Sequence, residues 1–355
     1  MVSSTVLPSA FAVRKFAGGP ALVAYAAVAA VAAVLLPRIS RGLSHRACVG
    51  ASLTLLLMLT LIFAVVYPVA NTHEPGRGSD DDDALNLGVR TLLELRSPYT
   101  ERTYLCNELH QLPGAFLLAA PFVLLGSSAM QNVFWLAVFW WVACIDFGPR
   151  RSTSLLAALS LLAPVVVHQV ATGTGHLSNA IYVLLGLWWL VRTEHQRAAA
   201  VALGVVLASR PNFAFLMPLV WGLQVRRQGL VATLQWSGIT IAVVAVLCLP
   251  FYLRDPAGFT PLWAVDRLAR FEALIPHAGW VLGGGLGVLS AILAFWTRDV
   301  AELWANSAWV IAFPVLAGWL LTSIADRSLD LEYLTYGSFA LPFALFALWS
   351  RIPAR

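Results

Sequence analysis

The sequence predicts an all-α, polytopic membrane protein that forms a single integral membrane domain over residues 1–355. Charged residues make up 12% of the chain, about half the share in a typical soluble domain, and the mean hydropathy is +0.76. The apolar residues come in runs of roughly 15–22, close to the length that a helix needs to cross the hydrocarbon layer. Because backbone amides in lipid must be paired within their own segment, such runs fold as helices. We therefore expect about 11 transmembrane helices.

The apolar runs follow one another through the whole chain, and most of the connections between them are short. Two connections are long and polar, at residues 71–112 and 253–278, so the chemistry is expected there and at the span ends that face them. The run 198–224 is long enough to be one span or two. Spans are expected at residues 20–36, 49–70, 113–126, 129–146, 153–170, 177–192, 198–224, 232–252, 279–296, 305–323 and 334–349.

The distribution of arginines predicts the orientation of the chain. The net charge is +5, but the arginines are scattered among loops between spans, so nucleic acid is not an expected partner. Placing the arginines of loops 37–48 and 225–231 in the cytoplasm satisfies the positive-inside bias and puts both long loops on the extracytoplasmic face. With one lysine and many Arg and Ala residues, the composition is typical of a GC-rich bacterium. The bacterial plasma (inner) membrane is therefore the expected location.

The middle of the chain allows two arrangements. If 113–126 crosses fully and 198–224 is one span, then Arg150, Arg151, Arg192 and Arg197 lie outside. If 113–126 is half-embedded and 198–224 breaks at Pro211, those arginines move to the cytoplasmic side. Charge favours the second arrangement and helix length favours the first.

The loop 71–112 carries eight of the chain's 18 acidic residues, four of them in the run Asp80–Asp83. Leu85, Val89, Leu92 and Leu93 follow at helical spacing, and Pro98 comes after them. Carboxylates are stabilised at the positive end of a helix. The pattern predicts a short amphipathic helix on the outer membrane surface, with the aspartates at its start.

Asp80, Asp81, Asp82 and Asp83 have two interpretations. One is a solvated helix cap, and the other is a general base held at the membrane surface, beside a helix that grips a lipid substrate. Four adjacent carboxylates repel one another unless cations neutralise them, so a divalent cation is one conceivable cofactor. The pattern requires none, and the four cysteines stand far apart without metal-ligand spacing.

The stretch GSDDDDALNLGVRTLLELRSPY (78–99), followed by LPGAFLLAAPFVLLG (112–126), resembles the first outer loop and next span of the C-type glycosyltransferase superfamily. The similarity is greatest to the bacterial polyprenyl-phosphate-sugar-dependent branch that includes mannosyltransferases. Two shorter matches are LASRPN (207–212) and GHLSN (175–179). The resemblance covers residues 49–255 as a core, leaving 256–355 as an outer loop and C-terminal helices. The family often has Asp-Glu and Lys where this chain has an Asp run and Arg.

The resemblance implies a membrane glycosyltransferase of the cell envelope that uses a polyprenyl-phosphate-linked sugar donor. It transfers the sugar, with inversion, to a hydroxyl of a glycan, lipid or protein acceptor at the outer face. Among the four aspartates, Asp81 aligns best with the catalytic acid, with Asp82 next. A buried arginine is costly in lipid unless paired, so Arg210 is interpreted either as snorkelling or as binding the donor phosphate.

The remaining polar candidates each have a structural alternative. Arg267, Arg270 and His277 belong to a second interfacial helix, with Leu262, Val265, Leu268 and Phe271 on its apolar face, that binds lipid headgroups or the donor phosphate. Asn107 and His110 either cap the next helix or bind sugar hydroxyls. His176, in the GHLSN turn, is interpreted as structural.

Two other classes of function stay open. A transporter or flippase for a lipid-linked or amphipathic substrate would show internal repeats and charged residues in broken mid-membrane helices. No repeat is evident, and apart from Arg210 the spans hold few charges. A non-catalytic assembly partner that keeps the family fold is the other alternative. Membrane lipids are expected partners in every case.

Overall fold

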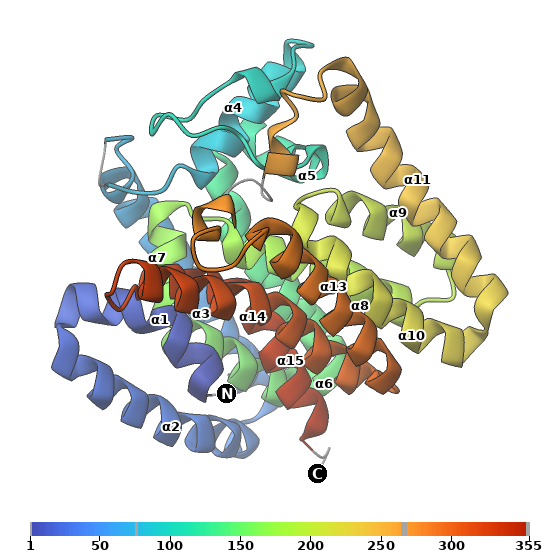
Figure 1. The fold of residues 1–355 in the computed structure, drawn as a ribbon. Helices are drawn as coiled ribbons and strands as arrows, with labels where there is room; N and C mark the ends of the chain where they lie inside the picture. Colours follow the sequence, from blue (N-terminus) through green and yellow to red (C-terminus); the bar gives the residue numbers. More distant parts are fainter. Residues whose placement is uncertain (1, 75–76, 264–267, 353–355) are drawn as a thin grey trace.

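The computed structural model describes residues 2–74, 77–263 and 268–352, and over these residues the protein is all-α. No β-strand occurs in this part of the chain, where Arg102 and Glu108 form an isolated antiparallel bridge. Figure 1 shows α4 and α5 as a cap at one end of the other helices. The helices are α1 (Val2–Ala17), α2 (Gly19–Gly42), α3 (His45–Ala70), α4 (Asp81–Leu93), α5 (Pro113–Leu124), α6 (Gln131–Leu161), α7 (Pro164–Thr172), α8 (His176–Arg192), α9 (Gln196–Leu207), α10 (Met217–Gln228), α11 (Leu230–Arg254), α13 (Ala278–Trp296), α14 (Val300–Ala325) and α15 (Leu341–Arg351).

Within the described residues, six helices are long and apolar enough to cross a membrane: α2, α3, α6, α11, α13 and α14. Helices α7 and α8 make a seventh if the pair, bent by 106°, is one span. The chain therefore has the character of a multi-pass membrane protein, but the expected count of 11 spans is not confirmed. Helices α5, α9, α10 and α15 have only 11 or 12 residues.

Two breaks in the chain bear on the expected spans. The division expected between segments 129–146 and 153–170 falls at Gly148, where α6 consists of two helical parts joined by a kink. The second segment is itself interrupted, because α6 ends at Leu161 and α7 begins at Pro164. Gly148 has φ +77°, which a glycine adopts without strain, and the chain turns sharply there. The run 198–224 breaks at Arg210 and Pro211 into α9, a 3-10 segment and α10.

Contacts between distant segments define two ends of the bundle. At one end Arg150 donates to the carbonyl of Leu43 at 2.9 Å, and Arg227 donates to the carbonyl of Val191 at 3.2 Å. We call this the arginine end. At the opposite end of α3, Asn71 donates to Asp82 and to the carbonyl of Thr172, and we call this the aspartate end. Arg150, Arg151 and Arg192 thus share an end with loop 37–48, as in the second of the two arrangements.

Helix α5 begins and ends at the aspartate end. The amide of Leu112 donates to the carbonyl of Ser209 at 2.9 Å. Just beyond the other end of α5, the Ser127 hydroxyl lies 3.0 Å from the Tyr67 hydroxyl, and the amide of Ser128 donates to the Asn86 side chain. The segment 113–126 therefore does not run through the bundle.

Helix α4 lies where the sequence predicts a helix, with Asp81–Asp83 in its first turn. Its apolar face is covered by protein: Leu85 and Val89 are 4% and 2% exposed and belong to a small core with Phe116 of α5. The expectation that Leu85 and Val89 face a membrane surface is therefore wrong. Only the end of the segment remains apolar and exposed, at Leu93 and Leu95.

In the second long loop, the described residues form short 3-10 segments at Thr260–Trp263 and Leu268–Phe271. The expected interfacial helix across this loop is not confirmed, since residues 264–267 lie outside the described part of the chain. Phe259 and Phe271 are buried, so both sides of the loop are attached to the bundle.

Candidate functional site

The four aspartates at the start of α4 point to different partners, and Asp81 lies at the centre of a buried polar cluster. Its Oδ1 accepts from Arg210 Nη2 at 2.9 Å and, more weakly, from Gln111 Nε2 at 3.4 Å. Its Oδ2 lies 3.2 Å from His176 Nε2 and accepts from the amide of Gly175 at 3.2 Å. Three segments other than α4, at Gln111, at residues 175–176 and at Arg210, thus converge on one carboxylate.

Burial by itself raises the pKa of the Asp81 carboxyl, because it disfavours the charged form. The positive charge of Arg210 opposes this, helped by His176 and by the hydrogen bond from the Gly175 amide, and the net result is a lowered pKa. Asp81 is therefore a carboxylate at neutral pH. Side chains of Asp81 and Arg210 are only 15% and 18% exposed, so little solvent screens the pair.

Arg210 reaches Asp81 because the chain is broken between α9 and α10. Arg210 has extended backbone angles and Pro211 starts the following 3-10 segment, which a proline favours at its first position. The guanidinium carbon lies 5.4 Å from the centre of the Phe339 ring. With the Asn179 amide oriented so that its oxygen faces the arginine, Arg210 Nε donates to that oxygen at 2.6 Å.

His176 is held from the other side by the C-terminal part of the chain. Its ring stacks on Tyr336 and Phe339, with centroid distances of 4.8 and 4.6 Å. Both aromatic residues belong to the 3-10 segment Tyr333–Phe339 that precedes α15. The 3-10 segment before α15 therefore contributes to the site, although the family resemblance covers only residues 49–255.

Asp82 is buried in a network of hydrogen bonds that holds neighbouring helices together. It is 1% exposed, and its carboxylate accepts from Tyr67 Oη at 2.5 Å and from Asn71 Nδ2 at 2.9 and 3.0 Å. Burial raises the pKa of Asp82 to about 6, although the bonds from Tyr67 and Asn71 lower it. Gly173 ends α7 with φ +78°, and a Cβ there would lie 2.9 Å from the Asp82 carboxyl carbon. Asp82 thus joins α3, α4 and the end of α7.

Asp80 and Asp83 tie the rest of the loop to α4. Asp80 Oδ2 accepts from Thr103 Oγ1 and Asn107 Nδ2, each at 2.8 Å. Asp83 Oδ2 accepts from the amide of Tyr104 at 2.9 Å. Asn107 therefore contacts an aspartate, whereas the sequence predicted a helix cap or a sugar ligand.

The other predicted binding residues are not brought to Asp81. His110 Nδ1 lies 3.4 Å from the carbonyl of Thr260, which joins the two long loops. Arg270 donates to Thr322 Oγ1 at 3.3 Å and its guanidinium lies over Phe271. His277 has φ +56° and its amide donates to Glu272. Arg267 lies outside the described residues.

Sequence reasoning missed several members of the cluster. Gln111, Asn179 and the aromatic pair Tyr336 and Phe339 were not assigned to a site, and His176 was taken as structural. A signal existed for two of them, because His176 and Asn179 stand in the polar turn GHLSN between apolar runs. Nothing in the local pattern points from the C-terminal aromatic residues to Asp81.

The cluster is a carboxylate, a guanidinium and an imidazole at one end of an apolar helical bundle. Such a group can accept a proton at the carboxylate and bind an anion at the guanidinium. Among the described residues, no group of three or more His, Cys, Asp or Glu side chains is arranged to hold a metal ion. No family model, curated protein or solved structure matches the chain.

Proposed function

We propose that the protein is a membrane glycosyltransferase of the C-type superfamily. Its donor is a polyprenyl-phosphate-linked sugar, and its acceptor is a hydroxyl group of a glycan, lipid or protein. The observation that carries the proposal is the ion pair between Asp81 and Arg210, which brings a candidate base and a candidate phosphate ligand together at one end of the bundle.

The proposed reaction is a single displacement. The acceptor hydroxyl gives its proton to an Asp81 oxygen while its own oxygen attacks the anomeric carbon. The bond from that carbon to the phosphate oxygen breaks, and polyprenyl phosphate leaves with the electron pair. Attack opposite to the leaving group inverts the anomeric centre, and Arg210 stabilises the charge that grows on the phosphate.

Arg210 is suited to both partners. One nitrogen, Nη2, contacts Asp81, and Nε contacts Asn179, whereas Nη1 has no hydrogen-bond partner among the described residues. A donor phosphate that draws the guanidinium toward itself weakens its pairing with Asp81. Burial then raises the pKa of the carboxyl and makes it a stronger base in the loaded site.

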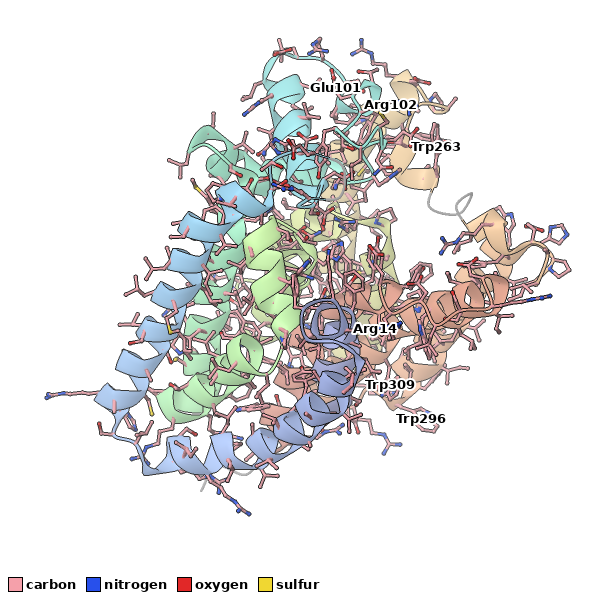
Figure 2. The ribbon with its side chains drawn as sticks, turned by 90° about the vertical axis from the view of Figure 1, so that its left-hand side faces the viewer. Arg14, Glu101, Arg102, Trp263, Trp296 and Trp309 are labelled. Carbon is pink, nitrogen blue, oxygen red and sulfur yellow. The ribbon has the colours of Figure 1, made fainter. Side chains whose placement is uncertain are left out.

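The proposed location is the plasma membrane of a bacterium, with the aspartate end on the extracytoplasmic face. The arginines of the short loops lie at the opposite end, where Arg150 and Arg227 contact Leu43 and Val191, whereas those of the long acidic loop, such as Arg102 (Figure 2), lie at the aspartate end. The positive-inside bias puts that end in the cytoplasm. A donor with its tail in the bilayer would present its phosphate near the outer surface, at the level of α4.

A transporter for a lipid-linked substrate is the second candidate, and one observation favours it. The bent pair α7 and α8 turns by 106° next to Gly175 and His176, and broken helices with polar groups at the break are typical of transporters. A transporter moves its substrate without breaking the bond between sugar and phosphate.

The experiment that tests the proposal follows the fate of the donor. Purified protein in nanodiscs is given polyprenyl-phosphate mannose with a mixture of candidate acceptors, and free polyprenyl phosphate and the glycosylated product are measured by mass spectrometry. A glycosyltransferase that accepts mannose releases both in equal amounts, and the product has the opposite anomeric configuration. In proteoliposomes, movement of intact donor between leaflets without release of polyprenyl phosphate would identify a transporter instead.

A further inference from the structure

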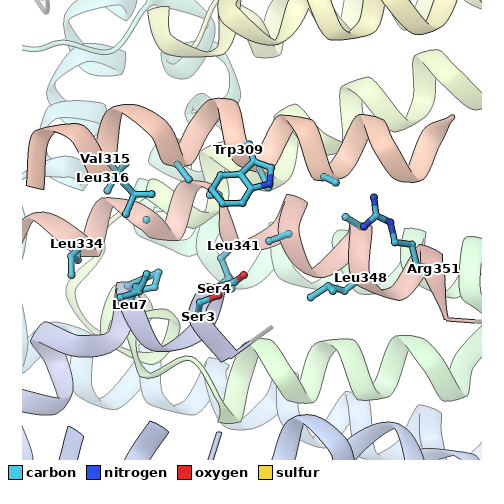
Figure 3. Close-up of a pocket in the computed structure, with 18 residues that line it drawn as sticks. Ser3, Ser4, Leu7, Trp309, Val315, Leu316, Leu334, Leu341, Leu348 and Arg351 are labelled. Atoms are coloured by element: carbon cyan, nitrogen blue, oxygen red, sulfur yellow. The ribbon is translucent and has the colours of Figure 1, made fainter. Parts of the chain in front are cut away.

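A second site is an apolar cavity of about 340 Å³ between α14 and α15, with the start of α1 as its third wall and without any residue of the Asp81 cluster in its lining. Figure 3 shows this cavity with Leu334 and Leu7 toward one end, Trp309 in the middle and Arg351 at the other end. The volume is in the range of small-ligand pockets, which start at about 300 Å³.

The cavity exists because the facing walls of α14 and α15 are lined by small side chains. Because these side chains are small, they leave the space between the two helices unfilled. Trp309, which lines the cavity, is 62% exposed. The small residues are Ala305, Ala308 and Ala312 of α14, Ala344 and Ala347 of α15, and Ala340 just before α15. The cavity thus opens toward the surroundings of the bundle, where the other exposed side chains are largely apolar.

The part of the cavity that follows α15 is about as long as one half of a bilayer is thick. From Leu341 to Arg351, α15 rises about 15 Å at 1.5 Å per residue. The hydrocarbon core of a bilayer is about 30 Å thick, so one leaflet contributes about 15 Å. An acyl chain that follows α15 can therefore run the length of the cavity with its headgroup at Arg351.

The charge at that end selects the headgroup. Arg351 is exposed and lies at the arginine end, because Arg151 donates to the carbonyl of Trp349 at 2.7 Å, one turn or less from Arg351. Ser3 and Ser4 line the cavity beside Leu341 and away from Arg351 (Figure 3), so Arg351 is the charged lining residue at the headgroup end. A guanidinium binds phosphate well. An anionic headgroup neutralises the positive charge of the guanidinium, whereas a zwitterionic headgroup has no net charge and does not.

We propose that this cavity binds one acyl chain of an anionic phospholipid from the leaflet at the arginine end, with its phosphate against Arg351. The site is distinct from the proposed donor site, since the donor phosphate belongs at the aspartate end. The inference therefore stands or falls independently of the glycosyltransferase proposal.

The test is native mass spectrometry of the full-length protein in micelles, titrated with phosphatidylglycerol or phosphatidylcholine. Wild type is expected to retain phosphatidylglycerol more strongly. Arg351→Gln should lower that affinity about fivefold and remove the preference, because one basic residue near an anionic lipid contributes about that factor. Ala344→Trp fills the cavity and should lower retention of both lipids.

The matched control is Arg46→Gln, which removes an exposed arginine at the same end that does not line the cavity. It should leave the affinity for phosphatidylglycerol unchanged. Arg351→Gln changes an exposed side chain, so it serves as the test even where Ala344→Trp fails to fold. Equal affinity of wild type for the two lipids would overturn the proposal. So would equal losses in Arg351→Gln and Arg46→Gln, or unchanged retention in Arg351→Gln.

Discussion

Replacing Asp82 by asparagine should remove a specific pH dependence of stability. Burial raises the pKa of Asp82 from 3.8 to about 6 in the folded protein, so the native state holds this proton more tightly than the unfolded chain. A shift of about two units corresponds to about 3 kcal/mol. Because the native state binds more protons between pH 4 and pH 6, this group's contribution to stability falls as pH rises through that range and is constant above it.

The measurement is the free energy of unfolding in mixed micelles from pH 4 to pH 8. Between pH 4 and pH 7, wild type should lose about 2 kcal/mol of this contribution relative to Asp82→Asn, since the other groups cancel in the comparison. Asparagine can accept from Asn71 and donate to Tyr67, so the fold is retained. The hydrogen bond from Tyr67 lowers the pKa of Asp82. Tyr67→Phe should therefore raise this pKa and make the loss of stability with rising pH larger than in wild type. Parallel profiles for wild type and Asp82→Asn would refute the reasoning.

Three further predictions follow from named contacts. Arg210→Ala should lower the free energy of unfolding by about 3–5 kcal/mol, because it leaves the buried Asp81 carboxylate without its cation. The double variant with Asp81→Asn should lose clearly less, and additive losses would show that the pair is not coupled. Gly88→Ala should lower stability by about 1–3 kcal/mol, because its Cβ would come within 2.2 Å of an aromatic ring of α5; an unchanged melting temperature would mean that α4 does not pack there. In intact cells and a background without exposed cysteine, Ser79→Cys should react with a membrane-impermeant thiol reagent and Gly229→Cys should not, and the reverse pattern would invert the proposed topology.

The sequence predicts local structure well wherever one segment decides it. Apolar runs without alternation can only be helices in lipid, and the long helices α3, α11 and α14 lie close to their expected ranges. The aspartates open α4 for the same local reason, since they stabilise its positive end. Counting spans succeeds less well, because an apolar run such as 198–224 fits one long helix or two short ones, and the sequence left both arrangements open.

What the sequence could not predict depends on contacts between distant segments. Leu85 and Val89 form an apolar stripe, and the pattern alone does not say whether protein or lipid covers it; in the structure α5 does. Asp81 and Arg210 were both chosen as site residues, but their pairing joins positions 129 apart in the chain. His176 looked structural because its stacking partners come from a segment 160 residues later, including Tyr336.

The most direct test of the central proposal is the rate at which Asp81→Asn releases polyprenyl phosphate from polyprenyl-phosphate sugar donors, compared with wild type and with Asp83→Asn. If Asp81 is the base, the first variant should be slower than wild type by at least about 100-fold, as expected for loss of general-base catalysis. Asp83→Asn, which loses only a bond to the backbone of Tyr104, should stay within a few fold of wild type. Near-normal release by a folded Asp81→Asn protein would contradict the proposal and leave the Asp81–Arg210 pair with a structural role.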